Sequence, residues 1–314
     1  MTARTRSLVI DTDTASDDAV ALIMALNHPQ HVVRALTIVA GNVPLEYAVR
    51  NALITTDLLG RADVPVYRGI AKPILRPLES AQHVHGPDGM SEAALMEPAR
   101  EPEETHAVQA LLEIAAAEPG RHVLVTLGPL TNIAAALMID PDLLTRFDHT
   151  FMMIGAADGN GNVSPTGEYN AWADPEAAAL VFAAPGRKTM IGWDVSRKYA
   201  VIRPDEDARM RALGRLGEFA SDINRAVYDF ATELSGTPGY DFPDPVSMAV
   251  ALDESLITES DDRHMLVSVS GDTRGQTFAD YRHPLKDANV RVVTAVDEAA
   301  FKQQLFAALT ESPA

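Results

Sequence analysis

The stretch 8–18, which reads LVIDTDTASDD, joins three apolar residues to four carboxylates within eight positions. Its apolar start predicts a buried strand, and the apolar periodicity of 20–26 predicts a helix directly after it. Like charges at short range raise one another's pKa, so four acids at the end of a strand need a reason. A bound Ca²⁺ or Mg²⁺ ion supplies one, because hard cations prefer carboxylate oxygens. The alternative, a solvated acidic loop with Asp17 near a helix start, leaves Asp11 and Asp13 unexplained.

Length and composition indicate a globular protein that does not bind nucleic acid. The 314 residues are 46% hydrophobic and 22% charged, which is ordinary for a chain with a large buried core. The formal net charge of −18 argues against nucleic acid and anionic membrane surfaces as partners. The absence of cysteine excludes disulfides, thiolate chemistry and cysteine-type zinc sites. Because no apolar run has the length of a signal peptide or a membrane helix, we expect a cytoplasmic protein.

The first half of the chain alternates apolar runs with helical patterns. Runs of Val, Ile and Leu are typical of parallel strands that are covered on both faces. Their alternation with helices predicts an α/β fold with a doubly wound, mostly parallel, Rossmann-like sheet. The expected strands are 7–10, 32–39, 122–127, 150–154 and 188–192. The expected helices are 17–27, 45–59, 105–117, 131–138 and 174–183.

The second half is more helical, and no repeat or linker divides the chain. We therefore expect one domain over 1–314, with a long loop at 68–104 that is rich in Pro, Gly and His. An antiparallel pair is expected at 264–270 and 276–281, because the segment between them is rich in turn residues. The other expected elements are helices at 205–213, 215–235, 245–253 and 297–310, and a strand at 290–295.

Polar clusters follow the predicted strands. In open α/β sheets, ligands bind outside the carboxyl ends of the strands, so these clusters should meet at one edge. They comprise the acids of 11–18, AGN at 40–42, LGPLTN at 127–132, the segment 155–162 with EYN at 168–170, and WD at 193–194. No G-x-G-x-x-G follows the first strand, so a dinucleotide site is not expected.

Two enzyme families contain a stretch similar to 8–18. Read as three apolar residues and D-x-D-x-T, it resembles the haloacid-dehalogenase phosphatases, with Asp11 as nucleophile and Asp13 as general acid. Read as D-T-D-x-x-x-D-D-A-x-A, it resembles the nucleoside hydrolases of the inosine-uridine-preferring type. A phosphatase would need an acidic pair after an apolar strand, whereas the pair 261–262 follows the polar segment 258–260. The phosphatase interpretation is therefore the weaker one.

The resemblance to nucleoside hydrolases extends, in order, from residue 8 to residue 252. Its motifs are VAGN at 39–42, HGPDGM at 85–90, LGPLTNIA at 127–134, EYN at 168–170, DPEA at 174–177 and DP at 244–245. The resemblance implies hydrolysis of the N-glycosidic bond of a small-molecule ribonucleoside, which releases ribose and a nucleobase. It further implies purine or pyrimidine salvage and assembly as a homodimer or homotetramer.

The resemblance also implies a calcium site beneath a ribose site. Ca²⁺ would be held by Asp13, Asp18, Asp244 and the backbone carbonyl of Leu127. Asp13 would also act as the base toward a water molecule, and Asp11 would orient its neighbours. The carboxylates would stabilise the oxocarbenium-like charge on the sugar. The groups expected to bind ribose hydroxyls are Asp17, Asn42, Asn162, Glu168, Asn170 and Asp244.

The chain departs from the family pattern at the leaving base. Pro243 stands where a His directly precedes the late Asp, and Pro cannot donate a proton. Ile154 stands where a Met commonly lines the pocket. His85 could be the acid, the substrate could have a leaving group that needs none, or an aromatic side chain could stack on the base. The aromatic candidates are Tyr228, Phe242 and Trp193. Pro243 also leaves open a ribose- or nucleoside-binding protein that has lost turnover.

Overall fold

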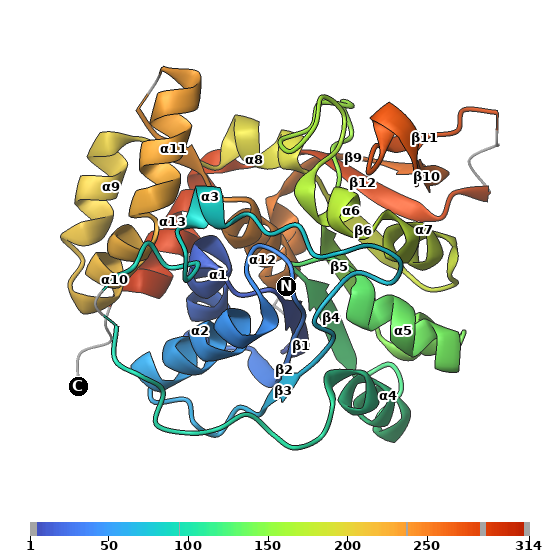
Figure 1. Ribbon diagram of the computed structural model, residues 1–314, viewed down its shortest axis with the longest axis horizontal. Helices are drawn as coiled ribbons and strands as arrows, with labels where there is room; N and C mark the ends of the chain where they lie inside the picture. Colours follow the sequence, from blue (N-terminus) through green and yellow to red (C-terminus); the bar gives the residue numbers. More distant parts are fainter. Residues whose placement is uncertain (1–4, 94, 237, 283–286, 311–314) are drawn as a thin grey trace.

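The computed structural model describes residues 5–93, 95–236, 238–282 and 287–310, around a central eight-stranded sheet (Figure 1). The strand order is β3-β2-β1-β4-β5-β6-β12-β9. All neighbouring strands are parallel except β12 and β9. The first six follow the order of a doubly wound sheet, in which the direction of winding reverses between β1 and β4. The predicted fold class is therefore confirmed.

The elements have the following bounds. The strands of the sheet are β1 (Ser7–Thr12), β2 (Val32–Ile38), β3 (Val66–Arg68), β4 (His122–Thr126), β5 (His149–Met153), β6 (Lys188–Ile191), β9 (Ile257–Arg263) and β12 (Val290–Val296). Two antiparallel pairs stand apart from it: β7 (Val201–Ile202) with β8 (Tyr240–Asp241), and β10 (Met265–Val267) with β11 (Thr277–Ala279). The helices are α1 (Ser16–Leu26), α2 (Leu45–Leu58), α3 (Gln82–His85), α4 (Ala107–Ala117), α5 (Thr131–Ile139), α6 (Tyr169–Ala173), α7 (Pro175–Ala183), α8 (Trp193–Tyr199), α9 (Pro204–Arg211), α10 (Arg215–Ile223), α11 (Arg225–Ser235), α12 (Pro243–Leu252) and α13 (Glu298–Leu309).

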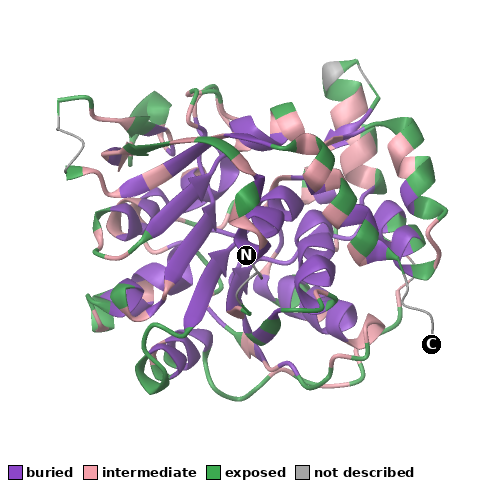
Figure 2. Cartoon of the chain, turned by 180° about the vertical axis from the view of Figure 1, so that it is seen from behind, coloured by how far each residue is buried: buried purple, intermediate pink, exposed green. Residues whose placement is uncertain are grey.

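Helices cover both faces of the sheet and bury its central strands completely (Figure 2). Leu8 and Ile10 of β1 belong to the core cluster that α1, α2, α12 and α13 close on one face. Val9 points the other way, into the cluster that α4, α5 and α7 close. The uninterrupted apolar run of β1 follows from this burial on both faces. Among the described residues, no helix has the length and hydrophobicity needed to cross a membrane.

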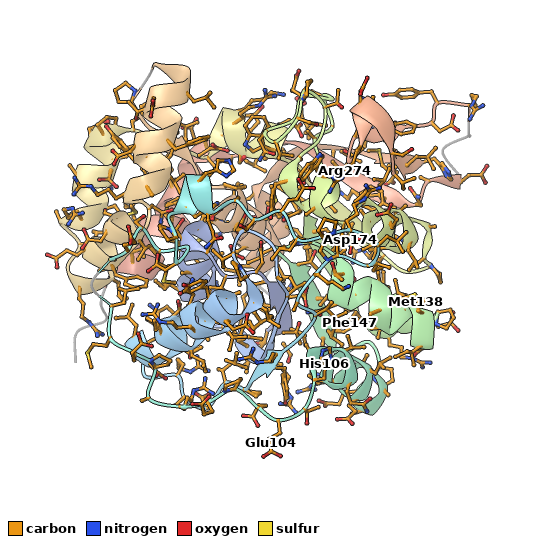
Figure 3. The ribbon with its side chains drawn as sticks, viewed as in Figure 1. Glu104, His106, Met138, Phe147, Asp174 and Arg274 are labelled. Carbon is orange, nitrogen blue, oxygen red and sulfur yellow. The ribbon has the colours of Figure 1, made fainter. Side chains whose placement is uncertain are left out.

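A buried acid anchors the long loop that precedes α4 to the body of the protein. One oxygen of Asp174 caps α7 by accepting the Ala177 N–H at 3.1 Å. The other oxygen accepts the Ile74 N–H at 2.9 Å and the Thr131 hydroxyl at 2.7 Å. Figure 3 labels Asp174, which is the N-cap residue of α7. The loop is therefore fixed against α5 and α7 and closes over the carboxyl end of the sheet.

The predicted helix 215–235 is wrong in one respect, because the structure has two helices, α10 and α11, that meet at Asn224. The apolar periodicity continues through the break, so the pattern alone could not reveal it. The Asn224 side chain is buried and donates to the Ala220 carbonyl at 2.9 Å, which ends α10 with a local hydrogen bond. The antiparallel pair predicted at 264–270 and 276–281 is confirmed as β10 and β11.

Strand β9 and several short elements were not predicted. β9 is polar and largely exposed, because it is the last strand of the sheet and pairs only with β12. The acidic pair 261–262, which the sequence placed after a non-strand segment, therefore lies within a strand. The short elements β3, α3, α6, α8, β7 and β8 were also missed, since runs of two to seven residues show little periodicity.

Candidate active site

The site forms where β1 and β4 end side by side, at the point where the winding of the sheet reverses. Asp11 of β1 is in register with Thr126 of β4, and the Leu127 N–H donates to the Asp11 carbonyl at 2.8 Å. The polypeptide that follows each strand therefore emerges at the same edge. A ligand site is expected there, because the two connections diverge and leave a crevice between them.

The Asp13 carboxylate is clamped between two glycines. A Cβ atom on Gly41 would lie 2.1 Å from Oδ2 of Asp13, and one on Gly128 would lie 2.6 Å from its Oδ1. The backbone N–H of Asn42 donates to Oδ2 at 2.5 Å. Both glycines are thus required by the close approach of the carboxylate. Asn42, predicted as a ribose ligand, positions Asp13 through its backbone.

Three further carboxylates converge beside Asp13. Oxygen atoms of Asp17, Asp18 and Asp244 lie within 4.8 Å of one another, and all three residues are buried. Asp17 and Asp18 open α1, whereas Asp244 lies in the first turn of α12. Asp18 accepts the Ala15 N–H at 3.0 Å, which caps α1 and fixes the carboxylate. The fold therefore brings together acids that are more than two hundred residues apart in the sequence.

The electrostatics of this cluster call for a cation. Burial is the largest cause of the raised pKa values in this cluster, and the charges of nearby acids raise them further. The pKa values of Asp17 and Asp18 rise to about 6, and those of Asp13 and Asp244 rise well above the ordinary value. One oxygen each of Asp13 and Asp17 has no hydrogen-bond partner among the described residues. None of the described ion pairs joins a lysine or arginine to these four acids. Unpaired oxygens on buried acids fit a hard divalent ion.

The predicted carbonyl ligand, Leu127, lies against Asn170. The Asn170 side-chain amide donates to the Leu127 carbonyl at 2.6 Å and to the Met153 carbonyl at 3.1 Å. The Met153 sulfur lies 3.3 Å from the same nitrogen. Ile154, singled out from the sequence as a pocket residue, instead belongs to the core on the α5 and α7 side of the sheet. Met153 is therefore the residue beside Asn170, and the sequence analysis missed it.

Glu168 and Asn162 shape the loop that leads into α6. The Glu168 carboxylate accepts the backbone N–H groups of Gly155 at 2.6 Å and Asn170 at 2.8 Å. Burial raises its pKa to about 7 despite these bonds. The side-chain amide oxygen Oδ1 of Asn162 accepts the Tyr169 N–H at 2.9 Å. Both predicted ribose ligands thus hold the loop in place through backbone contacts.

His85 lies at the mouth of the acidic cluster. Its Nδ1 is 3.0 Å from the Ser16 hydroxyl and 3.9 Å from an oxygen of Asp17. Burial lowers the pKa of His85 to about 4, so the imidazole is neutral at pH 7. The structure places this predicted residue next to the cluster, as a hydrogen-bonding group and not as a charged one. Ser16 was not singled out from the sequence, because a serine at a helix start is usually a cap.

Asp11 stands behind the cluster. It accepts the Thr37 hydroxyl at 2.7 Å and the Asn132 amide at 2.9 Å, and its other oxygen has no partner among the described residues. Burial raises its pKa to about 7. Asn132 also donates to the Ile38 carbonyl, so the contacts of Asp11 tie the ends of β1 and β2 to α5. These contacts suit an orienting role.

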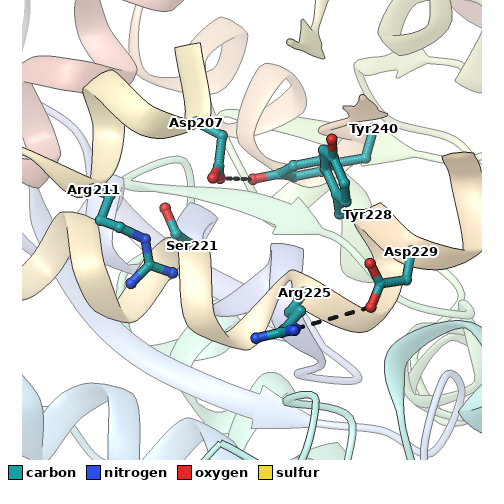
Figure 4. Close-up of a pocket in the computed structure, with 7 residues that line it drawn as sticks. All are labelled: Asp207, Arg211, Ser221, Arg225, Tyr228, Asp229 and Tyr240. Carbon is teal, nitrogen blue, oxygen red and sulfur yellow. Dashed lines mark hydrogen bonds and ion pairs between the residues drawn. The ribbon is translucent and has the colours of Figure 1, made fainter. Parts of the chain in front are cut away.

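The aromatic candidates occupy three different surroundings. Tyr228 of α11 packs edge-on against Tyr240, at 6.1 Å between ring centroids, in a pocket of about 250 Å³ between α9, α10 and α11 (Figure 4). Phe242 is fully buried and packs edge-on against Tyr240, at 5.0 Å between ring centroids. Trp193 donates its indole N–H to Asp241 at 2.8 Å. Asp241, which raises the pKa of Asp17, was not singled out from the sequence although it lies two residues before Pro243.

Comparison with known proteins agrees with this geometry. Residues 8–303 match the family model described as inosine-uridine preferring nucleoside hydrolase. The chain is 35% identical to a pyrimidine-specific ribonucleoside hydrolase, RihB, of Escherichia coli over 93% of each chain. It is 33% identical to a probable uridine nucleosidase 2 of Arabidopsis thaliana over 98% of each. The structure of a purine-preferring ribonucleoside hydrolase from Gardnerella vaginalis superposes with a TM-score of 0.91 at 31% identity, over 97% of this chain and 98% of that one. The chain therefore belongs to the inosine-uridine preferring nucleoside hydrolase family and is an enzyme that hydrolyses the N-glycosidic bond of ribonucleosides.

Proposed function

We propose that this hydrolysis depends on a Ca²⁺ ion held by Asp13, Asp18, Asp244 and the carbonyl of Leu127. The observation that carries the proposal is the convergence of buried carboxylates, with unpaired oxygens and no lysine or arginine paired to them in the described ion pairs. Leaving such a cluster without a counter-charge would be costly, because buried like charges repel. Ca²⁺ accepts carboxylate and carbonyl oxygens together, which suits this donor set.

The residues of the cluster would divide the chemistry between them. A bound Ca²⁺ would supply Lewis-acid activation of the attacking water and would orient the ribose hydroxyls. Asp13, clamped by Gly41 and Gly128, would accept the proton that the water loses. The negative field of Asp17 and Asp244 would stabilise the positive charge that develops on the ribose ring.

The ribose would lie above the cluster, against the groups predicted from the sequence. Asp17 has an unpaired oxygen that a sugar hydroxyl could satisfy. The Asn170 amide donates to the Leu127 carbonyl. Asn170, as a proposed ribose ligand, would therefore link the sugar to Leu127, a proposed ligand of the metal. Asn42, Asn162 and Glu168 would contribute by holding the loops around the sugar, in keeping with their backbone bonds.

The leaving base would be assisted by His85, since Pro243 provides no proton. A neutral imidazole carries one N–H, which can donate a hydrogen bond to a base nitrogen or oxygen as the bond breaks. Stacking by Tyr228 or Phe242 is the less supported alternative. Tyr228 faces the separate pocket of Figure 4, and Phe242 is enclosed in the core.

A panel of ribonucleosides tests the proposal. Reducing-sugar release should appear with at least one common nucleoside, fall on treatment with a chelator, and return when calcium is added. Full activity in the chelated protein would refute the calcium requirement. Calorimetric binding of calcium and ribose without any turnover would instead favour the nucleoside-binding protein that Pro243 leaves open.

A further inference from the structure

The hydroxyl of Ser16 makes a buried contact with the imidazole of His85 that plays no part in the proposed binding of calcium or ribose. Ser16 is the first residue of α1 and is fully buried, and His85 is the last residue of α3 and is 8% exposed. Oγ of Ser16 lies 3.0 Å from Nδ1 of His85. Either nitrogen of a neutral imidazole can carry its proton, and the hydrogen bond made by one nitrogen decides what the other can do.

Backbone contacts fix both partners of this hydrogen bond. The His85 N–H donates to the Ala81 carbonyl at 3.1 Å, and the His85 carbonyl accepts the Ser91 N–H at 3.0 Å. The Ser91 hydroxyl in turn donates to the Ile223 carbonyl at 2.6 Å, which ties this loop to the end of α10. Ser16 is held by its place in the first turn of α1. The fold therefore sets the geometry of the pair before a substrate binds.

The hydrogen bonds of Ser16 decide which partner donates. Among the described hydrogen bonds, the Ser16 hydroxyl has one partner, Nδ1 of His85. If Nδ1 carried the proton and donated it, the buried hydroxyl proton would be left without an acceptor, which is costly. If the hydroxyl donates instead, both groups are satisfied. Because burial keeps the imidazole neutral at pH 7, its single proton then lies on Nε2.

The surroundings of the two ring nitrogens agree with this assignment. An Asp17 oxygen that could accept a proton from Nδ1 lies 3.9 Å away, which is beyond hydrogen-bond distance. Nε2 makes no hydrogen bond to any residue that the structure describes. A proton on Nε2 is thus available to a bound molecule, whereas a proton on Nδ1 would face Ser16 and the acidic cluster.

We propose that Ser16 is a positioning residue of the hydrolytic reaction. Its hydroxyl donates to Nδ1 of His85 and keeps the imidazole proton on Nε2, so that Nε2–H can donate a hydrogen bond to the nucleobase as it leaves. The inference rests on the proposed role of His85 at the leaving group. It adds the residue that makes a neutral imidazole a donor at the nitrogen that is free to meet the substrate.

NMR of the calcium-treated protein, with isotopically labelled histidine ring nitrogens, reads this tautomer directly. A ring nitrogen that carries a proton resonates far from one that does not, and comparison with His85→Gln identifies the His85 signals. We expect Nε2–H in the unsubstituted protein. In Ser16→Ala the proton should move toward Nδ1, where the Asp17 carboxylate attracts it. Ser221→Ala is the matched control, because Ser221 is a buried serine whose hydroxyl has no partner among the described residues.

Steady-state kinetics separate positioning from a merely structural role. Ser16→Ala should slow hydrolysis of the best nucleoside of the panel by about two- to tenfold, mainly in kcat, because one hydrogen bond is lost. p-Nitrophenyl riboside, whose leaving group needs no such bond, should be cleaved at the original rate. In the His85→Ala background, Ser16→Ala should cause no further loss, because Ser16 acts through His85.

Three results would each overturn the proposal. They are a proton on Nδ1 in the unsubstituted protein, the same tautomer in Ser16→Ala, and a further loss of rate in the double variant. The tautomer of the unsubstituted protein remains a test even if Ser16→Ala does not fold. Failure of the proposed function shows separately, as absence of sugar release with every nucleoside, because the NMR measurement needs no turnover.

Discussion

Asp13 is the residue on which the proposed chemistry depends most. Replacing Asp13 by Ala removes both a metal ligand and the proposed base, and the base role alone accounts for about 10²–10⁴-fold in rate. We expect nucleoside hydrolysis to fall by at least this factor while the circular dichroism spectrum stays unchanged. Steady-state assays on the best nucleoside of the panel measure the loss.

Asp261→Ala is the control for this substitution. Asp261 is an exposed acid of β9, paired with Arg263, and its removal should leave the rate as it is. A near-normal rate in Asp13→Ala would show that the proton acceptor lies elsewhere in the cluster. Asp17 would then be the next candidate, because one of its oxygens is also unpaired.

Substitution of His85 tests how the nucleobase leaves. Because the His85 imidazole is neutral at pH 7, its loss should remove one hydrogen bond and slow inosine or uridine hydrolysis by about tenfold. p-Nitrophenyl riboside has a stable leaving group and should be cleaved at the original rate by His85→Ala. A loss of about 10²-fold or more on the nucleosides would indicate full proton transfer instead. Equal losses on both substrates would contradict any role at the leaving group.

At the scale of the element, the turn after β4 packs against the Asp13 carboxylate, which we propose as a metal ligand. Gly128→Ala would push a Cβ atom against Oδ1 of Asp13 and displace the carboxylate. We expect calcium affinity, measured by calorimetry, to fall on the order of 10- to 100-fold. Gly159→Ala is the control, because its backbone φ of +75° makes Ala unfavourable there, yet no carboxylate lies near its Cβ. Similar calcium affinities for the two variants would show that the clamp is unimportant.

The sequence predicts elements well where burial imposes a pattern. β1 is buried on both faces, so its apolar run marks it as a central strand. β9 lies at the edge of the sheet, where solvent accepts polar residues at every position, and its sequence carries no such mark. The break between α10 and α11 depends on the contact of one side chain, Asn224, which periodicity does not record.

The sequence identifies the acids of the site, but not the residues that contact Asn170 and His85. Asp13 and Asp18 stand out because carboxylates that follow a buried strand are costly without a ligand, and Asp244 is identified through the resemblance to the family. Met153 and Ser16 carry no such cost in the sequence, since each is ordinary in a core or at a helix start. Their places beside Asn170 and His85 follow only from the packing of the whole chain.

At the scale of the whole molecule, the buried acids make stability depend on pH and, under the proposed function, on calcium. The pKa values of Asp17 and Asp18 rise to about 6, and those of Asp11 and Glu168 to about 7. A raised pKa means that the folded state holds the proton more tightly than the unfolded state. The free energy of folding that these protonated acids contribute is fully present at pH values below the ordinary pKa of a carboxylic acid. It is lost as pH rises through 6 to 7. The chelated protein should therefore melt at a lower temperature at pH 8 than at pH 5.

Calcium should reverse this trend, because it binds the ionised cluster of the folded state only. Thermal melts with chelator and with calcium, each at pH 5 and pH 8, give the four values needed. The stabilisation by calcium should be larger at pH 8, where the acids have lost their protons. Calcium that stabilised the protein equally at both pH values would rule out the buried acids as its ligands.

The polar edge strand β9 has a consequence for how copies of this protein associate. An open sheet ends in unpaired backbone groups, which invite the edge of a second molecule to extend it. β9 presents Glu259, Asp261 and Asp262 to solvent. A second β9 laid alongside would bring carboxylates of both copies together, and their repulsion would oppose the contact. Growth of the sheet from one molecule into the next is thus discouraged, and a homodimer or homotetramer would have to form through other surfaces.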